Sequence, residues 1–582
     1  MNSNPAPRAS ARLAALALLA LPVRAASGAG APAEAPDVAY AIELVALEPE
    51  PRARVTLDVP AAGSGETLIS LRRDPSDEAR DGADFADLAA RGEDGRALVL
   101  EALGPERWKV RSAPGERLEV SWTLRDLGRD DGDDQRECYR PLLTPRFLHL
   151  IGKDGLLAPE HVAGDAPIAI ELAWRGFAER GWNVACSFGD ERLGVRVVRP
   201  LDEFRNALFV ATPRPILRRE VAGNRLSLAL LGDDWRVDLE EFADLCAKIV
   251  RTERDFFGDH ATPHYLVSAV PTGKPAENAR SLGGTGLEDS FALFFKRGSD
   301  LGRGSPMRAQ VERVLAHEMF HEWCGGSTPL GERERLSYWF SEGFTDFFTR
   351  RLLLRIGLID VAGYAESLER SAREYLANPH VSAPNALVDE RFWTDRDAGQ
   401  LPYRRGDLVA ALVDREVRVR TKGGRNLDDF VRQAVELGRK GERATTEVLV
   451  ARIARWTDAA FAERIRAIVE DGAPIELPAD LFAPCLVVTI VEEPGLELGF
   501  DLDASIANGK LTGVRAGSAA EAAGVRDGQG LASISYDRRV DRPVRLEVVV
   551  DGNRKAIEFL PHGPKRPVPA VEVVPGAGCD AL

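Results

Sequence analysis

The chain has 582 residues and a mass of 63.4 kDa, which corresponds to about three to five domains of ordinary size. Hydrophobic residues make up 44% of the chain and charged residues 29%, a mixture that excludes wholesale disorder and fibrous repeats. The net charge of -15, with no basic stripe, argues against nucleic acid and anionic lipid as partners.

The N-terminus has the three-part pattern of a secretory signal peptide. Arg8 and Arg12 precede the apolar run 13–21, and small residues follow at 25–27. We therefore expect residues 1–26 to be a signal peptide and the mature protein to be exported, either to the periplasm or out of the cell. No later apolar run approaches the roughly 20 residues that cross a bilayer, so no membrane span is expected.

A β-rich domain is predicted for residues 37–233, after an Ala-, Pro- and Gly-rich linker at 27–36. Short runs that alternate apolar and polar residues are separated by turn residues, which is typical of a β-sandwich or a similar all-β module. The clearest runs are Val55–Val59, Leu118–Leu124, Ile168–Trp174, Leu193–Val198 and Leu226–Leu231. Asp130–Asp134 lacks the spacing and the final Glu of a calcium loop, so we interpret it as a solvated acidic turn.

The pattern changes to helices in residues 234–473. Val237–Phe257 has helical spacing. Two strands are predicted to follow, at His264–Val270 and Ser290–Phe295. From Ser305 to about Glu470 the chain is predicted to be almost entirely helical. A β part followed by long helices favours an α+β catalytic domain.

The motif H-E-M-F-H at 317–321 is the strongest chemical signal in the chain. A Ser-Pro pair at 305–306 is a favourable helix start, so the motif is expected on a helix. His317 and His321 then lie on one face, about 5–6 Å apart at Cβ, and both imidazoles can reach one tetrahedral zinc ion. Glu318 lies beside the metal and can take a proton from a water molecule. The alternative is a pair of surface histidines on an amphipathic helix.

A second helix is predicted from Trp339 to about Ile356, with Gly357 placed to end it. Glu342 lies in an apolar and aromatic context, where a buried carboxylate needs a partner, and a metal ion is the simplest one. The alternative is a carboxylate stabilised by the helix dipole. Asp346, one turn later, can accept the free ring N–H of a ligating histidine and so orient it.

Three protein ligands, His317, His321 and Glu342, leave one coordination position open, which is the arrangement of catalytic rather than structural zinc sites. We expect one zinc ion per chain. With Glu318 as the general base, the predicted reaction is hydrolysis of a peptide or amide bond.

These motifs resemble those of the gluzincin clan, whose catalytic domains are thermolysin-like, and within it the glycyl aminopeptidase family. The resemblance is carried by H-E-x-F-H-x-W at 317–323, W-x-x-E-G-F-T at 339–345, G-L-E at 286–288, and a Tyr at 403 shortly before a Gly. It covers nearly all of the mature chain. It implies an aminopeptidase that acts on peptides with a free N-terminus and a small first residue, glycine or alanine.

The resemblance also implies roles at the substrate's N-terminus. Glu288 matches the family glutamate that faces the α-amine, where a carboxylate can pair with an ammonium. Gly286 ends a Gly-rich stretch that lets backbone approach the substrate. Asp289 stands where the family often has His, so it is a second candidate for the amine contact. The alternative for Glu288 is an exposed loop acid.

Tyr403 matches the family tyrosine whose hydroxyl stabilises the oxyanion of the tetrahedral intermediate. Its alternative is an ordinary residue at the start of an amphipathic helix. The two residues that follow, Arg404 and Arg405, are interpreted as surface or structural residues rather than as contacts to substrate.

The C-terminal part, residues 485–562, resembles a PDZ domain. The resemblance rests on L-E-L-G-F at 496–500 and the small-residue segment 517–525. PDZ domains bind a C-terminal peptide by strand addition, which predicts a peptide ligand near Gly499. The alternative is a module that only packs on the catalytic domain. Residues 563–582 are rich in Pro, Gly and Val and are predicted to be a poorly ordered tail.

The six cysteines contain no C-x-x-C pair, so neither a zinc ribbon nor a thioredoxin-type redox motif is present. They are too sparse for a disulfide framework. We interpret most of them as buried, with a disulfide or two that the sequence does not assign. They are Cys138, Cys186, Cys246, Cys324, Cys485 and Cys579.

The predicted fold class is multidomain α+β, with a β-sandwich-like domain, a mainly helical thermolysin-like zinc peptidase domain and a PDZ-like domain. The preferred function is an exported zinc aminopeptidase. A gluzincin endopeptidase is the second hypothesis. A catalytically inactive scaffold that works through its PDZ-like module is the third, and the presence of all three ligands with Glu318 and Tyr403 disfavours it.

Overall fold

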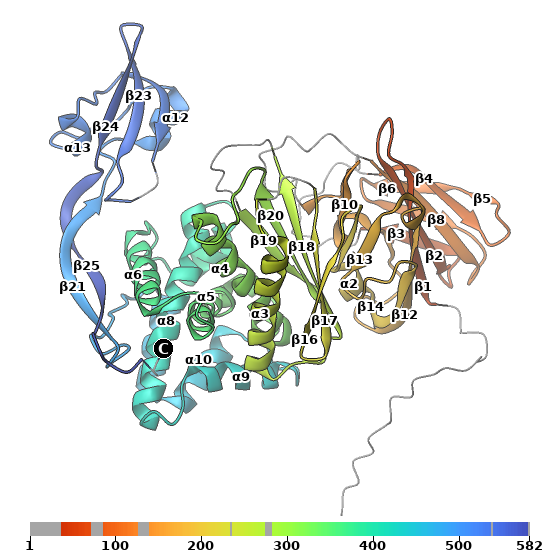
Figure 1. The fold of residues 1–582 in the computed structure, drawn as a ribbon, viewed down its shortest axis with the longest axis horizontal. Coiled ribbons are helices and arrows are strands. Elements are labelled where there is room, and N and C mark those ends of the chain that lie inside the picture. The colour runs from red at the N-terminus through yellow and green to blue at the C-terminus, as the bar shows by residue number, and fades with distance from the viewer. Residues whose placement is uncertain are drawn as a thin grey trace, which may run out of the picture.

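The computed structural model describes residues 36–71, 85–125, 139–232, 236–273, 282–536, 539–579 and 582. The predicted signal peptide, most of the linker and the acidic turn 130–134 lie outside these residues. The N-terminal sheets form one end of an elongated molecule, the helices lie beyond them, and a small C-terminal domain stands apart from both (Figure 1). Among the helices described, none has the length and apolar character needed to cross a membrane.

The N-terminal region is β-rich, and all of its predicted strands are present. Its strands are β1 (Val38–Ala46), β2 (Arg52–Pro60), β3 (Glu66–Ser70), β4 (Phe85–Gly92), β5 (Ala97–Leu98), β6 (Leu100–Gly104), β7 (Arg107–Arg111), β8 (Arg117–Arg125), β9 (Leu142–Thr144), β10 (Phe147–Ile151), β11 (Ala158–Pro159), β12 (Pro167–Arg175), β13 (Asn183–Cys186), β14 (Gly194–Pro200) and β15 (Leu208–Thr212). Three short helices interrupt them: α1 (Gly152–Gly155), η4 (Ala178–Arg180) and α2 (Leu201–Arg205).

These strands form three sheets around a shared hydrophobic core. The orders are β14-β12-β1-β2-β8-β4-β5, β13-β15-β10-β9 and β11-β3-β7-β6. Strand β2 shows why the alternating runs predict strands: Val55, Leu57 and Val59 point into the core, and the residues between them are more exposed.

A five-stranded mixed sheet begins the second region. Its strands are β16 (Leu217–Val221), β17 (Asn224–Leu230), β18 (His264–Thr272), β19 (Leu282–Leu287) and β20 (Ser290–Lys296), in the order β16-β17-β18-β20-β19. Helix α3 (Leu239–Phe257) connects the parallel strands β17 and β18. Because β17 pairs with β18, this sheet extends across the predicted boundary at 233/234. Strand β19 is antiparallel to β20 and forms the edge of the sheet.

The helical region has the predicted extent. Its helices are α4 (Pro306–Phe320), α5 (Tyr338–Arg355), α6 (Val361–Ala377), α7 (Asn385–Arg391), α8 (Arg396–Thr421), α9 (Leu427–Gly438), α10 (Thr446–Trp456) and α11 (Ala459–Glu470), with the short turns η5 (Glu322–Ser327) and η6 (Glu334–Ser337). Ser305 caps α4 by accepting a hydrogen bond from the backbone N–H of Arg308, and Gly357, at φ +70°, follows the end of α5.

Two glycines let α5 and α8 cross at backbone contact. A Cβ on Gly343 would lie 2.2 Å from the Cα of Gly406, and a Cβ on Gly406 would lie 1.8 Å from the carbonyl oxygen of Trp339. Only glycine fits at either position. Beside the crossing, Arg350 and Asp407 form a buried ion pair with N···O distances of 2.7 and 3.0 Å. The crossing places the start of α8 beside the first turns of α5.

A long two-stranded ribbon, β21 (Leu486–Leu496) with β25 (His562–Val573), joins the helical region to the small C-terminal domain (Figure 1). Its base carries a disulfide between Cys485 and Cys579. The predicted poorly ordered tail at 563–582 is therefore wrong for most of its length. Proline is tolerated in β25 because each ribbon strand has one side without a pairing partner, where a missing N–H costs nothing.

The small C-terminal domain has its own hydrophobic core, formed by residues such as Phe500, Leu511 and Val544. Its elements are α12 (Leu502–Asn508), α13 (Ala519–Ala522), β22 (Gly530–Ser535), β23 (Val544–Val550) and β24 (Asn553–Phe559). The chain after Gly499 forms helix α12, capped by Asp501, and not a strand. No strand edge for a peptide therefore directly follows Gly499, and the PDZ-like assignment and its ligand remain predictions.

Candidate active site and metal centre

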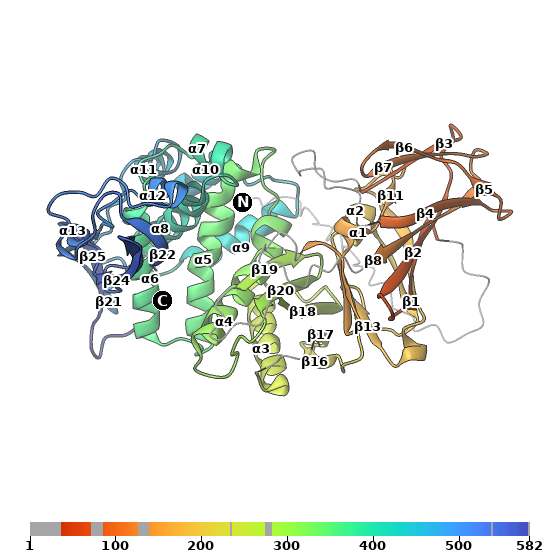
Figure 2. The ribbon, with the colours of Figure 1, turned by 90° about the horizontal axis from the view of Figure 1, so that it is seen from above.

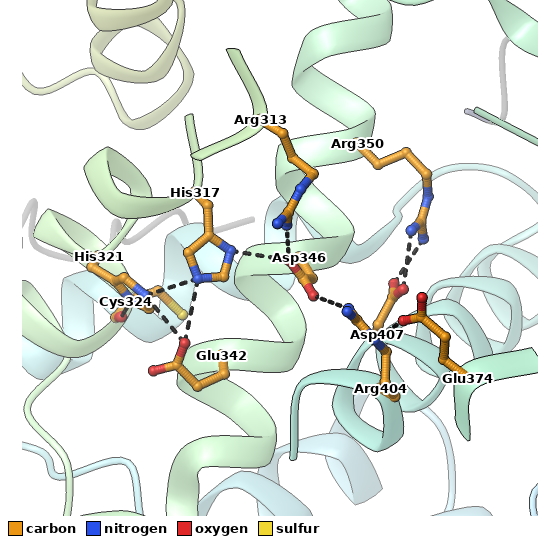
Figure 3. Close-up of polar contacts among 10 residues, drawn as sticks. All are labelled: Arg313, His317, His321, Cys324, Glu342, Asp346, Arg350, Glu374, Arg404 and Asp407. Atoms are coloured by element: carbon orange, nitrogen blue, oxygen red, sulfur yellow. Dashed lines mark hydrogen bonds and ion pairs between the residues drawn. The ribbon is translucent and has the colours of Figure 1, made fainter. Parts of the chain in front are cut away.

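Three side chains from α4 and α5 bring their donor atoms to one point (Figure 3). The Nε2 atom of His317 is 3.3 Å from Nε2 of His321 and 3.3 Å from Oε2 of Glu342. The Nε2 atom of His321 is 3.4 Å from the same oxygen. Tetrahedral zinc with bond lengths of about 2.0–2.1 Å separates its ligand atoms by about 3.3–3.4 Å. The donor types and their spacing therefore both fit a zinc ion.

Both imidazole rings are held through their other nitrogen. Nδ1 of His317 lies 3.0 Å from Oδ1 of Asp346, the partner that the sequence predicts. Nδ1 of His321 lies 3.1 Å from the backbone carbonyl oxygen of Cys324, in turn η5. Gly325, at φ +126°, allows that turn. With Nδ1–H donated to these oxygens, the Nε2 lone pairs face the metal position.

Asp346 is itself held by two arginines (Figure 3). Arg313 Nη1 donates to its Oδ1 at 3.2 Å, and Arg404 Nη1 donates to its Oδ2 at 2.8 Å. Although burial opposes it, the hydrogen bond with His317 and these cations hold the pKa of Asp346 well below its usual range. Arg404 thus has a structural role next to the metal position. Arg405 donates instead to backbone carbonyls, among them that of Ala383 at 2.7 Å.

The cluster is arranged to hold positive charge. Burial alone would lower the pKa of His317, but hydrogen bonds to Asp346 and Glu342 outweigh burial and raise that pKa to about 10. The carboxylates of Glu342 and Asp346 therefore stabilise a positive charge between them. A divalent metal ion supplies more of that charge than protons on the imidazole rings do.

Glu318 lies beside this cluster without being one of its three donors. Its Oε2 accepts a hydrogen bond from the backbone N–H of Gly286 at 3.3 Å. Burial raises the pKa of Glu318, and the charge of Glu342 raises it further, so this carboxylate has a strengthened affinity for a proton.

Glycines bring the edge strand β19 against α4. A Cβ on Gly284 would lie 2.6 Å from the ring of Phe291 and 3.2 Å from the side chain of Val314. A Cβ on Gly286 would lie 3.2 Å from the carbonyl oxygen of Glu318. The Gly-rich stretch therefore has a packing role, and it leaves a strand edge beside the metal position.

Tyr403 reaches the site from α8. Its ring stacks on that of His317, with centroids 6.0 Å apart and planes 21° apart. Burial, together with the charges of Glu342 and Glu318, raises the pKa of Tyr403 far above its usual range. The phenol therefore stays protonated and available as a hydrogen-bond donor.

Glu288 and Asp289 form the two-residue turn between β19 and β20. Asp289 has φ +47°, a left-handed conformation that Asp tolerates better than most residues. The backbone N–H of Glu288 donates to the carbonyl of Asn206 at 2.8 Å. The carbonyl of Asp289 accepts from the N–H of Leu266 at 3.1 Å. The turn is therefore fixed both to its own sheet and to the N-terminal region.

Arg199, at the end of β14, binds both residues of that turn. Its guanidinium lies 2.7 Å from Oε1 of Glu288 and 2.6 Å from Oδ2 of Asp289, and 3.6 Å from Oε2 of Glu203. Burial raises the pKa of Glu288 to about 7, and Asp289 and Glu203 add to the rise against the opposing effect of Arg199. The sequence analysis missed Arg199, because nothing in a β-strand arginine about 90 residues upstream indicates which turn it will meet.

One cavity of about 820 Å³ joins these groups. Its acid end is formed by Glu203, Glu288 and Asp289 around Arg199. Glu318, His321 and Glu342 line its middle. Its aromatic end is formed by Tyr338, Trp393 and Tyr403. The two ends come from separate parts of the fold. Glu203 of the acid end belongs to α2, which lies to the right of β19 in Figure 2, and Trp393 of the aromatic end follows α7, which lies to the left. Tyr338 and Trp393 carry no sequence motif and were also missed.

Comparisons with known proteins agree with this geometry. No curated protein matches the chain significantly. Residues 310–386, which contain both histidines, Glu342 and Asp346, match the family model of M61 glycyl aminopeptidases. Over this segment, the chain is similar to that family. Together with the cluster of His317, His321 and Glu342, the match supports the zinc metallopeptidase of the aminopeptidase type that the motifs predict.

One solved structure shows a similar fold over nearly the whole length of this chain. The chain is similar to an aminopeptidase N family protein from Idiomarina loihiensis, with a TM-score of 0.69 and 17% sequence identity over 94% of this chain and 99% of that one. An M1 zinc metallopeptidase from Deinococcus radiodurans matches with a TM-score of 0.45 and 18% identity over 76% of this chain and 94% of that one. The first match supports the multidomain α+β class predicted from the sequence.

Proposed function

We propose that this protein is an exported aminopeptidase of the M61 type that releases a small N-terminal residue, glycine or alanine, from peptides. One observation carries the proposal: the acid end of the cavity holds more negative charge than its arginine balances. Three carboxylates surround Arg199, and burial, together with the charges of Asp289 and Glu203, raises the pKa of Glu288 to about 7. Burial also raises the pKa of Glu322, which lines the same cavity, to about 8. A substrate ammonium would supply the missing positive charge.

Residues of the N-terminal region line the acid end, which favours an exopeptidase. Arg199, Glu203 and Asn206 all line the cavity there, and the carbonyl of Asn206 holds the backbone of Glu288. An endopeptidase would need the cleft to continue past this point for the residues that precede the cleaved bond. The preference for glycine or alanine rests on the match of residues 310–386 to the glycyl aminopeptidase family model.

In the proposed mechanism, His317, His321 and Glu342 would hold a zinc ion, which would supply Lewis-acid polarisation of the scissile carbonyl and of water. Glu318 accepts a proton from the attacking water, because it lies beside the three donors and its pKa is raised, and returns that proton to the leaving amine. The protonated hydroxyl of Tyr403 donates a hydrogen bond to the developing oxyanion. Asp346 keeps His317 oriented throughout.

Replacing Glu288 tests the amine contact. Glu288→Gln keeps the size of the side chain but removes its charge, so the charge-assisted contact with the ammonium is lost. Such contacts contribute about 1.5–3 kcal/mol, so kcat/KM for a glycyl peptide should fall by about 10- to 150-fold. The N-acetylated peptide has no ammonium, and its slow hydrolysis should barely change. Steady-state kinetics on the two substrates measure the difference.

The matched control is Glu334→Gln, which removes an exposed carboxylate that lines the same cavity outside the acid end. It should leave both rates nearly unchanged. Asp289→Gln should be measured beside Glu288→Gln, because Asp289 binds the same arginine. If neither variant separates free from acetylated amines, the endopeptidase hypothesis replaces the aminopeptidase one.

Export is the second part of the proposal. It is supported by the N-terminal signal pattern and by the disulfide between Cys485 and Cys579, since structural disulfides persist mainly in oxidising compartments. The full-length chain expressed in a bacterium should be recovered outside the cytoplasm with a new N-terminus near residue 27. Mass spectrometry of the intact protein gives the cleavage point. Cytoplasmic protein that keeps residue 1 would overturn this part alone.

A further inference from the structure

Trp393 is the most exposed tryptophan or phenylalanine side chain among the described residues, at 73%. Single exposed apolar residues are common and need no explanation. Trp393 differs because it lines the active-site cavity, next to the tyrosines of the aromatic end. Exposed indoles in such positions are enriched at binding surfaces, because they offer a large apolar area at little conformational cost.

The turn that carries Trp393 is rigid. Between α7 and α8, the backbone N–H groups of Thr394 and Asp395 donate to the carbonyl of Arg391 at 3.0 and 2.9 Å. The Asp395 side chain caps α8. Gly399 packs under the turn, where a Cβ would lie 2.7 Å from the carbonyl oxygen of Phe392. These hydrogen bonds fix the backbone that carries the indole, while the indole itself stays exposed.

A series of aromatic ring contacts connects Trp393 to α5, the helix that carries Glu342. The ring of Trp393 packs edge-on against Phe392 at 4.7 Å, and Phe392 packs edge-on against Tyr338 at 4.9 Å. Tyr338 lies one helical turn before Glu342 on α5. Trp393 and Tyr338 thus belong to the helical region, whereas the Glu288 turn belongs to β19 and β20.

The cavity is also larger than the N-terminal residue of the proposed substrate needs. At about 820 Å³ it is in the size range of pockets that enclose a drug-sized ligand, whereas glycine or alanine fills only a small part of such a space. With the N-terminus at the acid end and the cleaved bond at the metal position, the remaining length of a peptide runs toward the aromatic end.

We propose that Trp393 and Tyr338 form the binding surface for the substrate residues that follow the cleaved bond, and that the preferred substrates are short peptides with a bulky apolar residue in second or third position. This inference rests on the proposed aminopeptidase function. Glu334 lines the same cavity and its charge acts on Tyr338, so a substrate with an acidic residue there is disfavoured.

The test compares three substrates, Gly-Phe-Gly, Gly-Gly-Gly and glycinamide, in the full-length enzyme. The wild type should cleave Gly-Phe-Gly at least about 10-fold faster in kcat/KM than Gly-Gly-Gly, which corresponds to about 1.4 kcal/mol. Trp393→Ala should remove about 10-fold from Gly-Phe-Gly, mainly through KM, and less than about 2-fold from the other two. Trp393→Phe should restore most of the loss. Ile490→Ala, an exposed residue of the ribbon, is the control and should change none of the rates.

Each of the other possible results contradicts either this inference alone or the proposed function as well. An equal loss on all three substrates in Trp393→Ala, or no loss on any, would overturn the inference and leave the aminopeptidase proposal intact. Equal rates for Gly-Phe-Gly and Gly-Gly-Gly in the wild type would do the same. If the wild type cleaves none of the three, the proposed function fails and the inference falls with it. Thermal melting should show all variants folded, because Trp393 is exposed.

Discussion

Glu318→Gln should keep its zinc and lose nearly all turnover. The glutamine is the same size and keeps a carbonyl oxygen for the N–H of Gly286, but it cannot accept the proton of the attacking water. General base catalysis contributes about 10²–10⁴-fold, so kcat should fall by that factor with little change in KM. The zinc content should stay at the wild-type value, since the three donor atoms belong to other residues.

Metal analysis of the purified variant and steady-state kinetics on a glycyl peptide check both halves of this prediction. A suitable control is Glu312→Gln, on the same helix, where the carboxylate pairs with Arg308 at 2.9 Å outside the cavity. It should retain turnover. Loss of zinc from Glu318→Gln would mean that this residue is a ligand, and retained turnover would mean that another group takes the proton.

The parts of the site that could be predicted are those encoded by helical spacing. His317 and His321 share a face because they are four residues apart on one helix, and Glu342 and Asp346 share a face for the same reason. The structure places all four together, with Asp346 on the ring nitrogen that the sequence predicts. Spacing along one helix survives any arrangement of the domains, so a sequence can show it.

The parts that were missed depend on contacts between distant segments. Arg199 reaches Glu288 from the N-terminal region, and the Cys324 carbonyl that orients His321 is a backbone group with no side-chain signature. Trp393, in the turn between α7 and α8, lines the cavity through the packing of these helices on α5. Such partners follow from the packing of whole elements, which no local pattern specifies.

At the C-terminal end, the prediction from amino-acid composition was wrong because it ignored strand pairing. Residues after 561 are rich in proline and glycine, yet His562–Val573 pairs with β21 along almost its whole length. The PDZ-like resemblance stays a prediction, with Asp501 capping a helix after Gly499. A nearby strand partner decided the structure of the segment after 561.

Glu342→Ala should abolish both metal retention and turnover. Removal of the only carboxylate among the three donors leaves two neutral imidazoles, which neither complete the ligand set nor balance the charge of a divalent cation. Loss of a partner that only orients a ligand costs about 10–100-fold in metal affinity, so loss of a ligand should cost at least about 100-fold. Asp346→Asn is the graded control: it keeps all three donors and should weaken zinc binding only within that smaller range.

Zinc competition with a chelator of known affinity measures these effects without reference to catalysis. Thermal melting provides an independent readout, because a metal that binds only the folded state raises the melting temperature as its concentration exceeds the Kd. Added zinc should stabilise the wild type strongly, Asp346→Asn at higher concentrations only, and Glu342→Ala hardly at all. A Glu342→Ala variant that holds about one zinc per chain after dialysis would show that the metal is held by other residues, and the mechanism assigned to this cavity would then have to be abandoned.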